Sequence, residues 1–432
     1  MHSLNIIINS LVANTRYFFN LCSTFLSQIV SALSVLILTP ILLSKLGAAD
    51  FGVYGVLLNL VVFSGIFDFG FNIGLLKKLI DKDPSVKQLI NTLLSFFFLL
   101  FLFGFPFLYW IFSKGFIKLG ENYLFFAFLT ACLIVQNIIA VLFDVVIQSS
   151  NKIFIGKIIR VIKLTIEFIL ILILCKYHSI ILLLTASLFV NCLYILLLWI
   201  NAKKVFPFSF VINDFSFVIL TKHFVFSLWY FLGSVAAMLV FNSQVILMNF
   251  FIGAEGVAKY LIITRFYDII RIGLSNFTIV LFPTLAKFQT EGNWVLLKVF
   301  FYKSLFRVSV FAIVVFFLTL LIAKPFFLNW SKYADNEMNT LFIVFSIFIL
   351  FIVIENVAAT FISALKLNKL PTIVAIFQGI LGLVLGYFLL MKYGIIGMAI
   401  ASLIALISTN FIFNPWYLVK KMNEHIKLQS AI

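Results

Sequence analysis

Charged side chains interrupt an apolar stretch in the second half of the chain. In TRFYDIIRIG, residues 264–273, Arg265 and Arg271 each lie three positions from Asp268. Residues three or four apart share a helix face, so Asp268 can neutralise one arginine while one positive charge remains. A guanidinium binds two phosphate oxygens at once, and we therefore interpret this segment as a candidate site for a diphosphate group.

Further polar residues extend this candidate site to other apolar segments. Amides and hydroxyls hydrogen-bond sugar hydroxyls, and carboxylates inside a membrane balance charge or bind a coupling proton or sodium ion. For the substrate cavity we predict Arg265, Asp268, Arg271, Ser275, Asn242, Gln244 and Asn72. For ion coupling or charge balance we predict Asp68, Lys163, Glu167 and Glu355. Lys163 and Glu167 are spaced to pair within one helix. The alternative interpretation is that these side chains only join helices or reach the membrane surface.

The elements that carry these residues are predicted to be membrane helices. Of 432 residues, 64% are hydrophobic and 11% are charged, whereas soluble domains average roughly half and a quarter. Uninterrupted apolar runs of about 20 residues have the length of an α-helix that crosses the hydrocarbon core, and are too long for the strands of a membrane barrel. We predict an all-α integral membrane protein.

Twelve apolar segments are long enough to be crossings. They lie at residues 20–43, 52–76, 88–112, 122–146, 158–175, 179–200, 224–248, 256–283, 304–323, 339–363, 372–391 and 394–418. The first six form a predicted N-terminal six-helix bundle, 1–200, and the last six a C-terminal one, 224–432. Residues 201–223 are predicted to be a cytoplasmic or interfacial linker, and no soluble domain fits.

The distribution of Lys and Arg predicts the orientation. With the N-terminus inside, 21 of the 31 Lys and Arg fall in cytoplasmic segments, 7 in outer segments and 3 within the eighth crossing. Cytoplasmic loops retain positive charge, so both termini are expected in the cytoplasm. The net charge of +16 then reflects loops near anionic lipid headgroups, and we predict membrane lipids and not nucleic acid as partners.

Cysteine and histidine indicate no metal site. The cysteines lie in apolar segments without the spacing of metal ligands: Cys22, Cys132, Cys175 and Cys192. We interpret three isolated histidines near predicted membrane interfaces as loop residues: His178, His223 and His425. The nearest string to a phosphate-binding loop, NKIFIGKII, lacks the first glycine and the final Ser or Thr. We predict no cofactor, no catalytic residue and no coupling to ATP within the chain.

The two halves weakly repeat each other. LGAADFGVYGVLL, residues 46–58, matches IGAEGVAKYLIIT, residues 252–264, with Gly47 aligned to Gly253. A second pair of similar segments is IQSSNK, residues 147–152, and ISALKLNK, residues 362–369. Internal repeats of this kind are typical of transporters in which two bundles move about a central site.

These motifs resemble a known family. LGAADFGVYGVLLNLVVFSGIFDFGF, residues 46–71, is similar to the first hairpin of Wzx-type polysaccharide-biosynthesis flippases, which share the MOP superfamily with MATE-type multidrug exporters. KYGIIGMAIASLI, residues 392–404, is similar to the last hairpin. The resemblance implies two pseudo-symmetric six-helix bundles around a central cavity. It also implies alternating-access transfer of undecaprenyl-pyrophosphate-linked oligosaccharide across the bacterial inner membrane for O-antigen, lipopolysaccharide or capsule synthesis, with the polymerase and chain-length regulator of that pathway as further candidate partners.

Three other functions share parts of this pattern. An ion-coupled multidrug exporter has the same architecture, but organic cations favour an acidic cavity and the charges near residue 268 are on balance basic. A peptidoglycan lipid-precursor flippase also carries a pyrophosphate substrate. A polyprenyl-dependent glycosyltransferase or an O-antigen polymerase needs acidic catalytic residues on an outer loop or a large outer loop, and the predicted outer loops are short. We therefore predict a transporter and not an enzyme.

Overall fold

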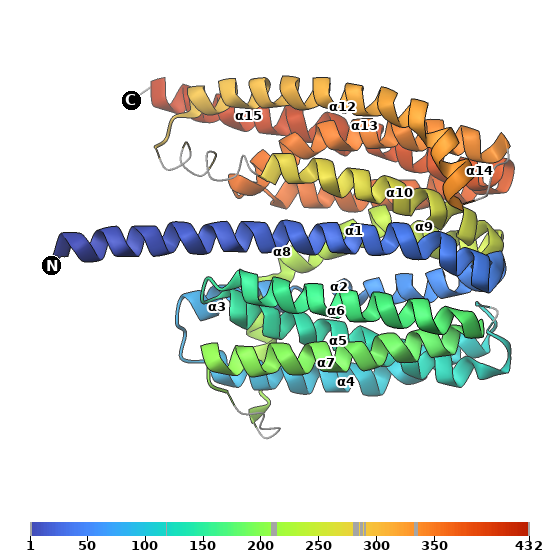
Figure 1. The fold of residues 1–432 in the computed structure, drawn as a ribbon. Helices are drawn as coiled ribbons and strands as arrows, with labels where there is room; N and C mark the ends of the chain where they lie inside the picture. Colours follow the sequence, from blue (N-terminus) through green and yellow to red (C-terminus); the bar gives the residue numbers. More distant parts are fainter. Residues whose placement is uncertain are drawn as a thin grey trace. The chain divides into compact units, whose positions relative to one another are not determined.

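All regular secondary structure in the described part of the chain is helical. The computed structural model describes residues 2–117, 119–208, 214–279, 285, 288, 291–331 and 336–430; inside helices, the side chains of 2–17, 274–279, 323, 324, 328, 331, 336 and 430 are not described. The described residues form α-helices, short 3-10 segments and turns, with no strand among them (Figure 1). This organisation is expected in a bilayer, where a helix satisfies its own backbone hydrogen bonds.

The contacts within the chain divide it into two compact units, residues 1–231 and 232–432. The first unit contains α1 (His2–Val62), α2 (Ser64–Phe67), α3 (Phe71–Ile80), α4 (Val86–Ser113), α5 (Tyr123–Gln148), α6 (Ile153–Leu174) and α7 (Ile180–Val205). Helix α8 (Phe217–Phe241) crosses the boundary. The second unit continues with α9 (Ser243–Phe251), α10 (Ala254–Ile279), α12 (Trp294–Ser331), α13 (Asn336–Ala364), α14 (Lys369–Ser408) and α15 (Asn410–Ser430). The predicted domain limits at residues 200, 223 and 224 remain a prediction.

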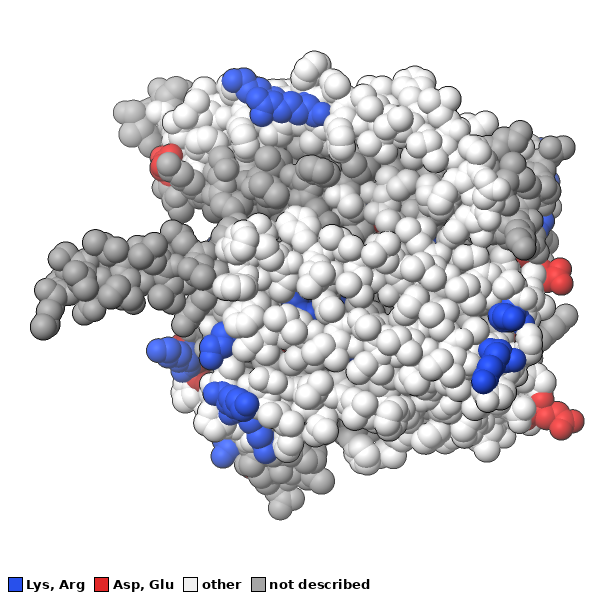
Figure 2. Space-filling model, in the orientation of Figure 1, with Lys and Arg blue, Asp and Glu red and all other residues white. Residues whose placement is uncertain are grey.

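Eight helical stretches of the described chain are long and apolar enough to cross a membrane. Two of them, Phe18–Phe67 and Lys369–Gln429, run for 50 and 61 residues, more than twice the roughly 20 residues that one crossing needs. Helices α6 and α10 have sufficient length but carry several charges each. Figure 2 shows that the visible charged side chains gather mostly toward helix ends, which leaves largely uncharged surface between them. The protein is therefore a multi-pass integral membrane protein.

The two longest stretches bend at glycines where the sequence predicted separate helices. Helix α1 is divided into two helices at Gly47, which has φ 81° and ψ 169°, and α14 is divided at Gly394, which has φ 59° and ψ −143°. Both are backbone conformations open almost only to glycine. The expected second crossing, 52–76, is not one helix, because it is interrupted at Phe63 between α1 and α2, and again between α2 and α3 at Phe69 and Gly70, both with positive φ.

The weak internal repeat has a structural counterpart. Gly47 and Gly253, aligned in the sequence, both have φ 81°. In the second pair of similar segments, Asn151 after α5 and Lys366 after α13 have φ 59° and 58°. Helices α5 and α13 also occupy similar places, because each is the most buried apolar stretch of its own unit and contacts several of that unit's other helices.

Close helix packing in the first unit depends on two glycines of α3. A Cβ atom on Gly74 would lie 2.5 Å from Ser227 Oγ of α8, and one on Gly70 would lie 2.8 Å from the Phe231 backbone nitrogen. The His223 ring stacks on Phe71 and its Nε2 lies 3.0 Å from the Phe71 carbonyl oxygen. The prediction of a loop position for His223 was wrong, since this side chain is buried within a helix.

The turn before α4 is fixed by a polar contact outside the apolar segments. The Ser85 backbone N–H and hydroxyl donate to Asp83 Oδ1 over 2.8 and 2.7 Å. These bonds, with a smaller contribution from the Lys78 ammonium 3.7 Å away, hold the pKa of the Asp83 carboxyl below its usual value. Asp83 therefore stays ionised near neutral pH, where it orders the start of the helix.

Replacing Gly47 by alanine is expected to lower the stability of the full-length protein in detergent. No atom lies within 4 Å of a Cβ atom at this position, so the cost arises from backbone strain alone, about 1–3 kcal/mol. The matched control is Gly104→Ala in α4, which also has open space around its Cβ atom but no positive φ and should be neutral or slightly stabilising. Thermal unfolding monitored by tryptophan fluorescence measures both. Equal melting temperatures for the two variants would contradict the strained conformation.

Candidate functional site

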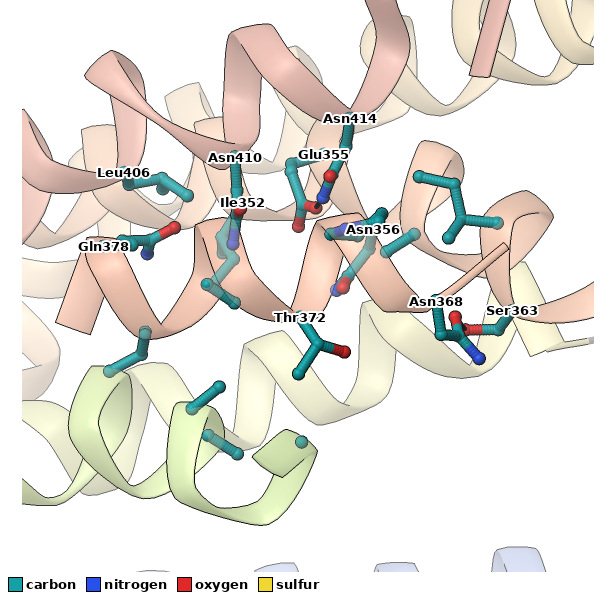
Figure 3. A pocket seen from close by; sticks show the side chains of 18 of the residues that line it. Ile352, Glu355, Asn356, Ser363, Asn368, Thr372, Gln378, Leu406, Asn410 and Asn414 are labelled. Atoms are coloured by element: carbon teal, nitrogen blue, oxygen red, sulfur yellow. Dashed lines mark hydrogen bonds between the residues drawn. The ribbon is translucent and has the colours of Figure 1, made fainter. Parts of the chain in front are cut away.

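Polar side chains from three helices of the second unit converge on one cavity. The cavity has a volume of about 480 Å3 and is also lined by apolar residues of α8. Figure 3 shows Glu355 and Asn356 on α13, Thr372 and Gln378 on α14, and Asn410 and Asn414 on α15. Since all three of these helices are otherwise strongly apolar or contain long apolar stretches, amides gathered at one point mark this cavity as the candidate functional site.

The carboxyl group at the centre of this cluster is held by a neighbouring helix. Glu355 is 7% exposed and Asn414 is 4% exposed. The Asn414 side-chain amide donates to Glu355 Oε1 over 2.5 Å. A buried carboxyl without a donor is costly, so this hydrogen bond joins α13 to α15 and fixes the position of Glu355.

The start of α15 supplies a second polar contact. Helix α14 ends at Ser408, and Thr409 departs from helical geometry with φ −124° and ψ −101°. Its hydroxyl lies 3.1 Å from Gln378 Oε1 and 2.6 Å from the Ala405 carbonyl oxygen. Because of this break in the helix, Asn410 begins α15 inside the cavity lining.

Two amide oxygens in the cavity have no hydrogen-bond partner among the described residues. These are Asn410 Oδ1 and Asn414 Oδ1, and both are buried. Buried acceptors are nearly always satisfied by protein, water or ligand. Together with the Glu355 carboxyl they make the cavity suited to groups that donate hydrogen bonds, such as sugar hydroxyls, or to a cation.

Arg271 brings a positive charge to the edge of the same cavity. Its guanidinium contacts Asp268 Oδ1 through Nη2 at 2.9 Å and Nε at 3.0 Å. It also lies over the Phe241 ring, 4.5 Å from the centroid. The Asp268 side chain is half exposed, at 50%, so this pair contributes modestly to stability, of order 1 kcal/mol, and mainly orients the guanidinium.

A smaller cavity of about 40 Å3 adjoins the first at Arg271. Asp268 and Gln244, both predicted from the sequence, line it together with Thr264 and Ser402. The Gln244 side-chain amide donates to the Val240 carbonyl oxygen and lies 3.4 Å from Ser402 Oγ. The structure thus brings together Arg271, Asp268 and Gln244 of the predicted site, and adds Glu355 through the larger cavity.

Other predicted residues of this unit lie elsewhere. Arg265 is half-buried on α10 and engaged in an interaction, but is not part of the described lining of either cavity. Asn242 lies at the break between α8 and α9, where its amide is 3.4 Å from Met238 Sδ. The side chain of Ser275 lies outside the described residues.

Predicted residues of the first unit form two separate pairs. Asp68 accepts the Asn72 backbone N–H over 3.3 Å, and the Asn72 side chain, 1% exposed, lies 3.5 Å from the Ile138 carbonyl oxygen. Lys163 and Glu167 form an ion pair of 2.6 Å on α6, as their spacing indicated. The assignment of Asp68, Lys163 and Glu167 to ion coupling or charge balance, and of Asn72 to the substrate cavity, remains a prediction.

Sequence reasoning missed the amides of the last two helices. Asn410 and Asn414 are four residues apart in TNFIFNP, and Gln378 is the single amide in the apolar run TIVAIFQGILGLVLGY. The helical spacing of the two asparagines was a usable signal, because it places them on one face. Their convergence with Glu355 depends on how α13, α14 and α15 pack, which no spacing within one helix reveals.

Comparison with known proteins now identifies the family. Residues 19–289, more than half of the chain, match the family described as Polysaccharide biosynthesis protein. The chain belongs to this family. No curated protein sequence matches this polysaccharide biosynthesis protein. The matched residues end before α12, so the helices that carry most of the polar cavity lie beyond them.

Solved structures extend the fold similarity to nearly the whole polysaccharide biosynthesis protein. A structure titled lipid II flippase MurJ, inward closed conformation, has a TM-score of 0.74 at 15% identity, over 94% of this chain and 90% of that one. An outward-facing MATE multidrug resistance transporter has a TM-score of 0.65 at 14% identity, over 95% and 96%. A MOP superfamily transporter from Pyrococcus furiosus has a TM-score of 0.63 at 14% identity, over 92% and 94%. The fold is that of MOP transporters.

Replacing Asn414 by alanine is expected to destabilise the protein by about 1–3 kcal/mol, since the buried Glu355 carboxyl loses its donor. Asn410→Ala is the matched control, because Asn410 lies one turn earlier on the same helix and its side-chain oxygen has no partner. Thermal unfolding in detergent should show the larger loss for Asn414→Ala, and Glu355→Gln should restore part of it in that background. The assigned contact is wrong if Asn410→Ala costs as much.

Proposed function

We propose that this protein is a flippase that moves undecaprenyl-pyrophosphate-linked oligosaccharide repeat units across the bacterial inner membrane by alternating access, for O-antigen or capsule synthesis. The family supplies the biosynthetic context. The observation that carries the proposal is the polar cavity of the second unit, where neutral amides and hydroxyls lie next to one guanidinium.

The chemistry of the lining matches an oligosaccharide better than an apolar compound. Asn410 and Asn414 present unpartnered acceptors, and Thr372 and Gln378 add a hydroxyl and an amide. Sugar hydroxyls both donate and accept hydrogen bonds, so they can pair with the polar groups of this lining and leave none of them without a partner. The amides of this cavity would bind the sugars of the substrate, and the guanidinium would bind its pyrophosphate.

Arg271 is our candidate for the pyrophosphate contact. Asp268 holds its guanidinium through Nε and Nη2 to a single carboxylate oxygen, which orients the planar group in the cavity lining, where a phosphate would bind it. We propose Arg271 rather than Arg265 for this contact, because Arg271 lines both cavities. Arg265, Asn242 and Ser275 remain secondary candidates.

Glu355 is our candidate for coupling to a proton or sodium gradient. Its carboxyl lies in the same cavity as the two unpartnered amide oxygens, and oxygen ligands suit a small hard cation. Protonation of the Glu355 carboxyl would neutralise its buried charge, as a bound cation would. We assign Asp68, Lys163 and Glu167 to charge balance within the first unit.

The proposed topology has twelve crossings with both termini in the cytoplasm. The eight apolar stretches become ten when the stretches bent at Gly47 and Gly394 are each counted twice. Helices α6 and α10, with 22 and 26 residues, supply the other two despite their charges. We propose the six-helix bundles 1–200 and 224–432, joined by 201–223, as its halves.

Two related transporters are the alternatives. The structure titled lipid II flippase is named for a peptidoglycan precursor, and a lipid-linked pyrophosphate substrate of that kind would use the same groups of this cavity. A multidrug exporter shares the fold, and since Asp268 pairs with Arg271 and Glu355 lies in the same cavity, this lining would also admit an organic cation.

Deletion of the gene in its native bacterium tests the proposal. We expect complete lipid-linked repeat units to accumulate on the cytoplasmic face while surface polysaccharide disappears. Unchanged surface polymer with increased drug accumulation would overturn the proposal in favour of an exporter. Arrest of peptidoglycan synthesis with accumulated lipid precursor would favour the second alternative.

Complementation with Arg271 variants tests the cavity. We expect Arg271→Ala to reduce surface polymer about 10- to 100-fold, the loss of a charge-assisted hydrogen bond to phosphate, and Arg271→Lys to retain part, because lysine keeps the charge but not the planar fork. Arg307→Ala on the exposed face of α12 is the matched control and should complement fully. Full complementation by Arg271→Ala at normal expression would exclude this role.

A further inference from the structure

A second hollow of the C-terminal unit lies between α12 and α15, away from the residues of the polar cavity. This α12–α15 groove has a volume of about 630 Å3. Its lining shares no residue with the polar cavity. One part is apolar and the other carries lysines, and it is lined by Phe301, Tyr302, Leu305, Pro415, Trp416, Val419, Lys420, Asn423, Glu424 and Lys427.

The two helices run antiparallel and are joined firmly at the polar end of the groove. Lys298 donates to Asn423 Oδ1 over 2.8 Å. The Trp294 and His425 rings stack with centroids 4.0 Å apart. Farther along, Phe301 packs into the hydrophobic core formed with α13 and α15. These contacts hold α12 and α15 together, and they therefore define the polar end and the walls of the groove.

The polar end of the groove is positively charged. Its lining contains two lysines, Lys420 and Lys427, and one carboxylate, Glu424. Glu424 forms an ion pair of 2.7 Å with Lys421, so its charge is already balanced by a lysine that is not part of the lining. A negatively charged group entering this end meets a net positive potential.

The position of the aromatic residues indicates the level of the membrane surface. Tyr302 and Trp416 are 48% and 56% exposed at the groove, and the Lys420 ammonium lies 5.2 Å from the centre of the Trp416 ring. Exposed Trp and Tyr gather where hydrocarbon meets headgroups. Leu305 and Pro415 lie on the hydrocarbon side of this level, and Lys420 and Lys427 lie on the headgroup side.

We propose that the α12–α15 groove binds an anionic glycerophospholipid. Its phosphate lies at Lys420 and Lys427, and one acyl chain lies along Leu305 and Pro415. Basic pockets between membrane helices near the interface bind anionic lipid headgroups in this way. The bound lipid joins α12 to α15, and α15 also carries Asn410 and Asn414 of the polar cavity. The site is independent of the transported substrate, so it does not depend on the proposed function.

Native mass spectrometry of the full-length protein in detergent, titrated with phosphatidylglycerol or phosphatidylcholine, tests this site. We expect preferential retention of phosphatidylglycerol and an apparent affinity about 30-fold lower in Lys420→Gln/Lys427→Gln, the attraction that two lysines provide near an anionic membrane surface. Val419→Trp should also reduce retention by filling the groove without changing its charge. Phosphatidylglycerol with a photoreactive acyl chain should crosslink to peptides containing 301–305 and 415–419.

Lys203→Gln/Lys204→Gln is the matched control. These lysines also lie near the end of a membrane helix. The Lys203 ammonium lies 4.0 Å from the centre of the Trp199 ring, an arrangement similar to that of Lys420 and Trp416. The proposal is overturned by equal retention of the two lipids, by equal losses in control and groove variants, or by crosslinks outside the groove. Displacement of the crosslink by polyprenyl phosphate but not by phosphatidylglycerol would also overturn it, because the groove would then belong to the substrate.

Discussion

Hydrocarbon contains no water to bond a free N–H or carbonyl group, and this constraint explains where polar residues occur in the protein. Each break in an apolar helix needs local polar partners. Asp68 lies at the break before α3, where it accepts the Asn72 N–H. Asn242 lies at the break between α8 and α9, and Thr409 at the break between α14 and α15. The helix breaks therefore place polar groups inside the membrane, and the polar cavity of the second unit adjoins the break at Thr409.

The same constraint governs the charged residues. Lys163 and Glu167 pair on one helix, as do Arg271 and Asp268, while Glu355 receives its donor from another helix. Intrahelical pairs stabilise each residue's position but require nothing from tertiary packing. The Glu355 contact differs, because it exists only when α13 and α15 pack together. This dependence makes the cavity sensitive to any relative movement of those two helices.

The sequence was sufficient to predict the membrane class, the helical nature and most helix positions, since apolar length reflects bilayer thickness directly. It also placed Arg271, Asp268, Gln244 and Glu355 among the candidate residues. It also predicted the separation of the last two crossings, because Gly394 has non-helical φ and ψ angles and divides α14 into two helices. It missed Asn410 and Asn414. A neutral amide costs less to bury in a membrane than a charge, so its presence in an apolar segment is a weaker indication of a functional site. The importance of Arg271 over Arg265 depends on which helix face meets α8 and α13, which is a tertiary property.

The two units have similar helix arrangements, yet their polar interiors differ. In the first unit, Asp144 of α5 bonds Gln148 over 2.8 Å, and its other oxygen contacts the place where Gly156 lacks a side chain. Helix α6 thereby packs directly onto this carboxylate. In the second unit, α14 follows the corresponding turn, but Thr372 and Gln378 line a cavity beside Glu355. A carboxylate covered by a closely packed helix serves structure, whereas one that faces a cavity with unpartnered amides is accessible to a ligand or an ion. The two units thus share these features of helix arrangement, and they differ in that a cavity lining in the second replaces the glycine-mediated contact of the first.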